Sequence, residues 1–590
     1  ADPPPFLNGR YRDLDTVAFP VDCLRVLAEA GNPVTGEHVD REMAAQYLWF
    51  DVKDEASDRF RRMGIELVQP SGNLSLPLSV AMFQRRGDWM TAVKGQRNLT
   101  FATEFYPYQG FNTMGRYGSF GSLVVQSKRE APGKPVTVRA SGFEPGKGWD
   151  FNHWPGTTVR VLPYEELRSH FLVEESMTEE YFAGGTSLDG NGLFAMKLQE
   201  DLPGATDYRR IGPVKWWLGE TEYNRRIKDS CYDTSFRARK SYFFFDDLIV
   251  CLGSGITSED KRFPIATTIF QNCLSGERRE KFSFDGKGEE VFPMEITEAT
   301  NGKGKDGLWL LDSCDTGYWI PADNGVLRIV RAKRSLPYYS HWRIDDAKLD
   351  PSLLPLNDEK KENEGDMELA WLDHGTAPAS ASYEYAVLID TNSEKIAKFA
   401  EEMKRRRTAD ESAIDNPPYR ILQKDTKAHI VWHRSSDSTG YGIFDEEWSP
   451  VVSHQSSADQ IQELKTNDQR PKTENCVLLS VSHPCIVMTR PAGEGRMRVS
   501  LANPDWGIDP NVPPDTGLRP DMPFLHNRLD LVKVYPEIRT HAVFRGNWDV
   551  RGEDVSRLDG GPAGTTSVEF RCVAGLPVQA EFMDISLNGK

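Results

Sequence analysis

The run "YFFFDDLIVCLG", residues 242–253, is one of a series of short apolar runs that begins after Gly64. The runs are rich in aromatic and β-branched residues, and turn residues separate each from the next, which is typical of β-strands. No long helical pattern stands between them, so we expect antiparallel pairing rather than βαβ units. The other runs before residue 391 are "LPLSVAMF", "GSLVVQ", "VTVRA", "TTVRVL", "LFAMKL", "ATTIFQ", "GLWLLD", "GVLRIVRA" and "YEYAVLID".

Three segments instead have apolar residues at helical intervals, namely 21–31, 40–50 and 393–407. Asp40 is the expected N-cap of the second helix and Ser393 that of the third. Two N-terminal helices cannot close a core alone, so we expect them to pack against something larger.

Strand patterns resume after the third helix, in "YRILQ", "AHIVWH", "CVLLSVS", "CIVMTR", "RMRVSLAN", "HAVFRG" and "SVEFRCV". We therefore predict a mainly β fold with a short α-helical N-terminal part followed by antiparallel β-sandwich domains. The expected divisions are a helical part over 1–64, a large central sandwich over 65–390 and a C-terminal sandwich over 391–590.

Composition excludes some classes of protein. The chain has 590 residues, a formal net charge of −17 and 39% apolar residues, so it can bury large cores but is not the basic protein that binds nucleic acid. No apolar run is long enough to span a membrane. The start, "ADPPPFLNGRYRDLD", has no Met and no signal-peptide pattern, and we expect it to be a mature or processed end.

The cysteines and histidines predict no metal site. The eight cysteines are at least nine positions apart, which excludes CxxC sites and favours buried free thiols. His429 and His433 have i, i+4 spacing in a predicted strand, whereas that spacing suits a metal only on a helix. No organic cofactor is expected; calcium at loop oxygens is left open.

One region is basic in this acidic chain. Residues 65–163 contain eleven Lys or Arg against six Asp or Glu. This excess has two interpretations, a fluctuation of composition or a cationic surface for an anionic ligand.

The string "WDFNHWPGTTVRVLP", residues 149–163, places two tryptophans, an asparagine and a histidine on a turn before a β-branched run. It also has two interpretations. One is a packed corner between strands; the other is a surface that stacks against sugar rings.

Several motifs, in this order, resemble polysaccharide lyase family 8, and the bacterial chondroitin sulfate ABC lyases in particular. They are "FLNGRY" (6–11), "ATEFYPYQGFNTMGRYGSFGSLVV" (102–125), the 149–163 string, "GGTSLDGNGLFAMKL" (184–198), "TTIFQN" (267–272), "GLWLLDSCDTGYWI" (307–320) and "AWLDHGTAPASASYEYAVLID" (370–390). The resemblance covers nearly the whole chain and is strongest from about 100 to 390.

The resemblance implies a fold and a reaction. Such enzymes have a helical (α/α) toroid followed by β-sandwich domains, so residues 1–64 would be the end of the toroid. They cleave uronic-acid polysaccharides by β-elimination, leaving a C4–C5 double bond. A site of this kind neutralises the uronate carboxylate, removes the C5 proton and protonates the leaving oxygen.

The resemblance also assigns site residues. Arg10 matches the family's catalytic Arg, and Glu104 matches its catalytic Glu, which holds such an Arg in place. Substrate contacts are implied for Arg116 and for the 149–163 loop, where the matching loop of the relatives faces the cleft. The loop residues are Trp149, Asn152, His153 and Trp154. His153 stands where the relatives have Arg, and a structural ion pair is the alternative for Arg116.

No segment matches the family's catalytic His and Tyr, which the resemblance places upstream in the toroid. An upstream helical half is therefore an expected partner. The other expected partner is an anionic polysaccharide, chondroitin or dermatan sulfate, with hyaluronan as an alternative substrate. A secreted or periplasmic bacterial protein is expected. The alternatives are a non-catalytic carbohydrate-binding β-protein and a hydrolase with paired carboxylates, which would give saturated products.

Overall fold

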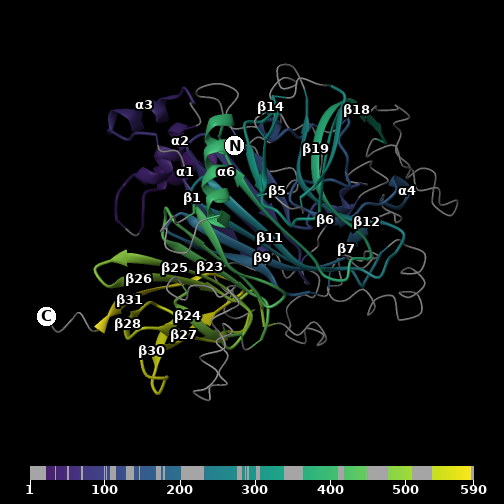
Figure 1. The fold of residues 1–590 in the computed structure, drawn as a ribbon. Coiled ribbons are helices and arrows are strands. Elements are labelled where there is room, and N and C mark those ends of the chain that lie inside the picture. The colour runs from purple at the N-terminus through teal and green to yellow at the C-terminus, as the bar shows by residue number, and fades with distance from the viewer. Residues whose placement is uncertain are drawn as a thin grey trace, which may run out of the picture.

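The three N-terminal helices lie at one side of a stack of antiparallel sheets, and the short helix α4 (Tyr164–Leu167) lies at the other side (Figure 1). The computed structural model describes residues 21–33, 35–49, 52–67, 71–98, 100, 103–105, 114–127, 138–144, 146–167, 174–176, 178, 180–200, 232–274, 282–285, 287–288, 292–300, 306–337, 363–408, 417–446, 448–449, 476–507 and 535–585.

Three helices form the N-terminal part, α1 (Val21–Ala30), α2 (Arg41–Trp49) and α3 (Glu55–Arg62). They share a small core of their own that includes Leu24, Tyr47 and Phe60. Asp40 caps α2 as predicted, since its carboxylate accepts hydrogen bonds from the backbone N–H groups of the next turn. Helix α3 was not predicted from the sequence, because its only deeply buried large side chain is Phe60.

A nine-stranded sheet forms the middle of the stack, in the order β14-β13-β16-β17-β20-β11-β10-β9-β8. Its strands are β8 (Ala183–Leu188), β9 (Asn191–Gln199), β10 (Arg237–Phe245), β11 (Leu248–Thr257), β13 (Ser283–Phe284), β14 (Lys287–Gly288), β16 (Leu308–Leu311), β17 (Gly317–Ile320) and β20 (Ala381–Leu388). The run 242–253 forms the paired strands β10 and β11 at its centre.

Both faces of this sheet are buried, which explains the continuous apolar run. Tyr242 and Phe244 of β10 lie in one core, whereas Phe243 and Phe245 lie in a second core on the opposite face. Successive side chains of a strand point to opposite faces, so a strand between two cores needs apolar residues at every position.

Two sheets close the first core. One has the order β15-β18-β19-β12-β6 and the other β1-β2-β3-β5. Their strands are β1 (Gly72–Leu76), β2 (Ala81–Arg86), β3 (Trp89–Lys94), β5 (Ser122–Gln126), β6 (Thr158–Arg160), β12 (Pro264–Cys273), β15 (Met294–Ala299), β18 (Val326–Leu336) and β19 (Asn363–Thr376). A separate two-stranded ribbon pairs β4 (Thr103–Phe105) with β7 (Glu174–Ser176).

The second core lies between the nine-stranded sheet, helix α6 (Ser393–Thr408) and a seven-stranded sheet ordered β21-β22-β23-β25-β26-β31-β28. A last sheet, β24-β27-β30-β29, closes a third core on the far side. The strands are β21 (Tyr419–Lys424), β22 (Ala428–His433), β23 (Ser438–Ile443), β24 (Leu478–Val481), β25 (Cys485–Gly493), β26 (Arg496–Ala502), β27 (Ile538–Arg545), β28 (Trp548–Arg551), β29 (Val555–Leu558), β30 (Thr565–Cys572) and β31 (Val578–Asp584).

The mainly β antiparallel fold is confirmed, and the domain limits at 64 and 390 stay predictions. The second core takes residues from both sides of position 391, for example Phe243 of β10 and Ile486 of β25. The central and C-terminal sandwiches therefore meet through a buried apolar layer, with the C-terminal strands at one end of the stack (Figure 1).

Two local predictions were wrong. The run "VTVRA" continues as a 3-10 helix, η6 (Val138–Ser141), and not as a strand among the described residues. Helix α6 begins at Ser393, but the side chain that caps it belongs to Asn392, whose Oδ1 accepts a hydrogen bond from the Lys395 N–H at 3.0 Å.

Among the described residues, six of seven cysteines are buried and all seven are free, and only Cys23 is exposed. Buried free thiols were the expected state. No helix in the described part of the chain has the length and hydropathy needed to span a membrane.

Candidate functional site

The strand that carries Glu104 is short and pairs with one other strand. In the β4–β7 ribbon, Glu104 lies directly opposite Glu175. The side chains of this ribbon lie outside the described residues, as does Arg10 entirely. The catalytic roles of Arg10 and Glu104 therefore stay predictions.

Arg116 lies in the 3-10 helix η5 (Gly115–Tyr117), which neighbours β4. Its side chain is buried, and Nη2 lies 2.6 Å from Oε1 of Glu200. The guanidinium also stacks 3.7 Å over the ring of Tyr232. This is the structural ion pair, and nothing in the geometry supports the predicted contact with substrate.

Glu200 also forms an ion pair with a second arginine, Arg160. Nη2 of Arg160 lies 2.6 Å from the other carboxylate oxygen, Oε2, and Nη1 lies 2.6 Å from Oδ2 of Asp260. Burial opposes the charged form of Arg160, but Glu200 raises its pKa above the ordinary value. The result is a buried, charge-balanced network that holds η5 and β6 together.

The basic excess of residues 65–163 is partly internal. The structure describes the side chains of seven of its eleven cationic residues, and four of these seven are buried, Lys94, Arg97, Arg116 and Arg160. These four charges belong to the scaffold and cannot contribute to a cationic surface.

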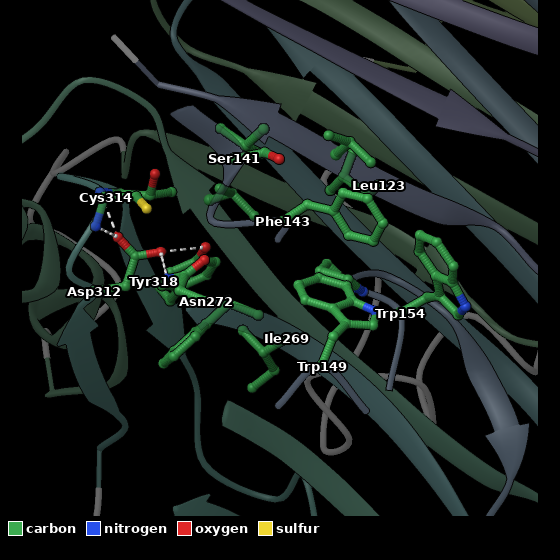
Figure 2. A pocket seen from close by; sticks show the side chains of 16 residues that line it. Leu123, Ser141, Phe143, Trp149, Trp154, Ile269, Asn272, Asp312, Cys314 and Tyr318 are labelled. Atoms are coloured by element: carbon green, nitrogen blue, oxygen red, sulfur yellow. Dashed lines mark hydrogen bonds between the residues drawn. The ribbon is translucent and has the colours of Figure 1, made fainter. Parts of the chain in front are cut away.

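The aromatic residues of the 149–163 string lie inside the molecule. Trp149 and Trp154 are 1% and 0% exposed. Both pack on Phe143, at ring-centroid distances of 4.7 and 5.5 Å, and Figure 2 shows the three rings together. Such clustered rings contribute to the core through apolar burial and edge-to-face contacts.

The polar residues of the string are buried as well and bonded within the chain. Asn152 donates from Nδ2 to the Leu162 carbonyl and accepts from the Leu162 N–H through Oδ1, both at 2.9 Å. His153 Nδ1 lies 3.0 Å from Oγ1 of Thr268. Burial lowers the pKa of His153, although Asp150 opposes this change, so the imidazole is neutral near pH 7.

The string is therefore the packed corner between strands, the alternative left open from the sequence. Trp149, Asn152, His153 and Trp154 are each at most 4% exposed and present almost no surface to a polysaccharide in this structure. The sequence-based error has a physical cause, because stacking on a sugar and packing in a core select the same flat rings.

Two buried side chains that the sequence did not single out fasten this corner to the centre of the fold. Lys240 donates from Nζ to the carbonyls of Phe120 and Gly156, at 2.8 and 2.6 Å. Tyr242 donates to Gly156 and Gly121. Burial lowers the pKa of Lys240 well below its ordinary value. The available signal was a lysine at a core-facing position of an apolar strand.

A second polar network surrounds Asp312, beside a small cavity (Figure 2). Asn272 donates from Nδ2 to Oδ2 of Asp312 and to Oε1 of Glu368, both at 3.0 Å. Arg331 lies 3.2 Å from the other oxygen of Glu368. Burial, reinforced by Glu368, raises the pKa of Asp312 to about 7.

This network can hold or release a proton near neutral pH, but it cannot bind a sugar. The cavity has a volume of about 20 Å³, which is enough for about one water molecule. Its lining is mostly apolar, with Trp149, Trp154 and Phe270 among its walls.

Within the described residues, no three His, Cys, Asp or Glu side chains come together as possible metal ligands. His429 lies in strand β22, as predicted, and both ring nitrogens lie 2.8 Å from serine hydroxyls, of Ser241 and Ser254. Its role is structural.

The chain is similar to known proteins along most of its length. The model of "polysaccharide lyase family 8, super-sandwich domain" matches residues 79–400, more than half of the chain.

Three curated relatives are lyases by name. A chondroitin sulfate ABC exolyase of Bacteroides thetaiotaomicron is 27% identical over 98% of this chain and 49% of its own length. An exolyase of the same name from Proteus vulgaris is 24% identical over 82% of this chain and 39% of its own length. The chondroitin sulfate ABC endolyase of Proteus vulgaris is 26% identical over 69% and 33%. The chain thus spans about half the length of the first of these relatives and less of the others.

Solved structures support the fold. A Paenibacillus xanthan lyase has a TM-score of 0.62 at 15% identity, covering 98% of this chain and 45% of its own. The chondroitin AC lyase of Streptomyces coelicolor has a TM-score of 0.57 at 17% identity, covering 95% and 58%.

Proposed function

The chain belongs to polysaccharide lyase family 8, and from that premise we propose that it forms the β-sandwich half of a lyase acting on sulfated glycosaminoglycans. The proposed substrates are chondroitin and dermatan sulfate, with hyaluronan as a related polymer. The proposed reaction is β-elimination at a uronic acid, which leaves a C4–C5 double bond in the product.

The observation that carries the proposal is the extent of the likeness to a chondroitin sulfate ABC exolyase, which covers 98% of this chain. The two relatives from Proteus vulgaris are also named for chondroitin sulfate ABC. A binding protein without activity has no comparable support.

Two residues are proposed for the chemistry. Arg10 would lie near the uronate and the catalytic tyrosine, where a guanidinium stabilises a carboxylate or phenolate. Glu104 would orient Arg10. The C5 proton becomes acidic enough to remove only when the neighbouring carboxylate is neutralised, so losing either residue should slow the elimination itself.

We further propose that the catalytic His and Tyr come from an upstream helical half. The relatives are about twice the length of this chain. The helical part also exposes large apolar side chains, among them Val26 and Leu27 at 54% and 53% and Met63 at 42%. A helical partner would cover this surface.

A secreted or periplasmic location is proposed, because a polymeric glycosaminoglycan is met outside the cytoplasm. Fractionation of the source cells followed by immunodetection checks this location. A cytoplasmic signal alone would contradict it.

The reaction is tested by ultraviolet absorbance of unsaturated uronate, with chondroitin sulfate and dermatan sulfate as substrates. The chain is assayed alone and mixed with the upstream helical half of the Bacteroides thetaiotaomicron relative. We expect product in the mixture and none from the chain alone. Saturated products would indicate hydrolysis, and polysaccharide binding without product in either sample would indicate a binding protein.

A further inference from the structure

The outward face of the five-stranded sheet carries a row of four residues across four strands. Thr297 of β15 pairs with Arg328 of β18, Arg328 pairs with Trp371 of β19, and Trp371 pairs with Thr268 of β12. Directly paired residues of antiparallel strands lie on the same face, with Cβ atoms about 5 Å apart. The four side chains therefore form a continuous line.

The strand alternation shows that this line faces away from the first core. On β18, Leu327 and Ile329 flank Arg328 and belong to that core. On β19, Ala370 and Leu372 flank Trp371 and belong to it as well. Since neighbours along a strand point to opposite faces, Arg328 and Trp371 point outward.

Arg328 retains hydrogen-bonding capacity. Its Nε donates to Oδ2 of Asp373 at 2.8 Å, and Nη1 makes a long contact of 3.4 Å with Oγ1 of Thr297. Within the described part of the chain, Nη2 has no partner, and the side chain is 38% exposed. Asp373 thus orients the guanidinium while its outer edge stays open to a ligand.

Trp371 is half-buried and supported from one side. The buried imidazole of His153 lies 5.0 Å from its ring, so the packed corner forms a wall beside it. The indole N–H donates to no residue that the structure describes. The side chain therefore offers an aromatic surface and a free donor next to an open guanidinium.

We propose that three members of this row, Thr297, Arg328 and Trp371, together with Asp373 on the same strand as Trp371, form a binding subsite for a uronic acid ring of a polysaccharide. Trp371 would stack on the C–H face of the pyranose, and the open edge of Arg328 would pair with the carboxylate. Thr297 is exposed and can bond a ring hydroxyl. The identity of the polymer that contains this uronate rests on the proposed function.

The surrounding charges limit the ligand to one anionic group. Glu295 is exposed on the same face of β15, opposite Val330, and Asp373 already neutralises part of the Arg328 charge. A densely sulfated stretch would be repelled, whereas a ring with one carboxylate would fit. Val326 and Val330, both half-buried, extend the apolar surface along β18.

The chain contains a matched control. Arg420 and Trp432 are also directly paired across two strands, β21 and β22. There, however, Trp432 is 6% exposed and its indole N–H donates to Asp437 at 2.8 Å. This second Arg–Trp pair therefore offers a ligand neither an exposed ring nor a free indole N–H.

The test uses the whole chain with ¹⁵N-labelled tryptophan indoles. W371F identifies the Trp371 signal by its loss, and the protein is titrated with unsulfated chondroitin, dextran sulfate and neutral dextran. We expect the Trp371 signal to move with unsulfated chondroitin and not with dextran. R328Q should weaken that binding by about fivefold to tenfold, since a charge-assisted hydrogen bond is lost, and R420Q should leave it unchanged.

Three other results would overturn the subsite, and one would separate it from the lyase activity. A Trp371 signal that stays fixed shows that there is no subsite, whether or not unsaturated product forms. A response to neutral dextran, or binding by R328Q as tight as by the wild type, would show that Arg328 does not pair with a carboxylate. A response to dextran sulfate alone would show that the site binds a sulfate group and not a uronate. A shift of Trp371 in a protein that forms no product with any upstream half supports the subsite and contradicts the lyase.

Discussion

At the scale of single residues, the fold depends on charges that are buried together. Glu200 pairs with two arginines from different elements, Arg116 and Arg160, and Asp260 supplies the second negative charge of the network. Removing one member of such a buried group is costly because the others stay desolvated and unpaired.

Glu200→Ala should therefore destabilise the chain by about 3–5 kcal/mol in urea unfolding. The control is Glu402→Ala, since Glu402 pairs with Arg434 at 2.7 Å but both side chains are partly exposed. That change should cost about 1 kcal/mol or less. Equal losses of stability in the two variants would show that burial of the ion pair does not determine its contribution to the free energy of unfolding.

The Asp312 network should give stability a dependence on pH. Burial and Glu368 raise the pKa of Asp312 from 3.8 to about 7. A carboxyl with a raised folded pKa contributes stability that is complete below the unfolded pKa and is lost as pH rises through the folded one. Because of this group, the urea concentration at the unfolding midpoint should decrease as the pH rises from about 4 to about 7. Asp312→Asn should make this dependence of the midpoint on pH weaker. If the midpoint of the variant depends on pH as strongly as that of the wild type, a group other than Asp312 binds the proton.

At the scale of the elements, alternation and turn residues predict most strands, because each strand lies against one or two cores. The failures have local causes. "VTVRA" has β-branched residues, but its described part, residues 138–140, lies in the 3-10 helix η6. The corner itself was ambiguous, since burial of Trp149 depends on Phe143 and on strands distant in sequence.

The turn of this corner requires glycine. Gly156 has φ +80°, and a Cβ there would lie 2.6 Å from Cβ of Leu123. Gly156→Ala should cost at least about 2 kcal/mol, from backbone strain together with overpacking. Gly375→Ala is the control, with φ +71° and nothing within 4 Å of the new Cβ, and it should cost about 1 kcal/mol. Urea unfolding compares them, and equal losses would exclude the steric contribution.

At the scale of the whole molecule, the sheets are joined by shared cores, and His429 lies at one such junction. It bonds Ser241 of β10 and Ser254 of β11 from strand β22. Burial lowers its pKa from 6.5 to about 3.

This histidine should weaken the junction in acid. A depressed folded pKa means that the unfolded chain binds the proton first, so the stability from neutral His429 is lost as pH falls from about 6.5 towards about 3. His429→Gln should reduce the slope of the urea midpoint over that window. His541→Gln is the control, since His541 is 53% exposed, and an identical slope in both variants would contradict the assignment.

The candidate site was less predictable than the fold. Motif resemblance gave Arg10 and Glu104, which the described residues do not test, and it assigned ligand contacts to Arg116 and Trp154, which are buried. Whether an aromatic or cationic side chain faces a core or solvent depends on long-range packing. Sequence spacing alone could not separate Trp154 from the outward-facing Trp371.

The central claim is that this chain supplies essential residues to a β-elimination site. The most direct measurement is the initial rate of unsaturated uronate formation from chondroitin sulfate, by the chain joined with an upstream half, for wild type and E104Q. E175Q, at the directly opposite position of the ribbon, is the matched control. The account predicts a loss of about 10²- to 10⁴-fold for E104Q and a near wild-type rate for E175Q. A wild-type rate for E104Q, or no unsaturated product from wild type, would contradict it.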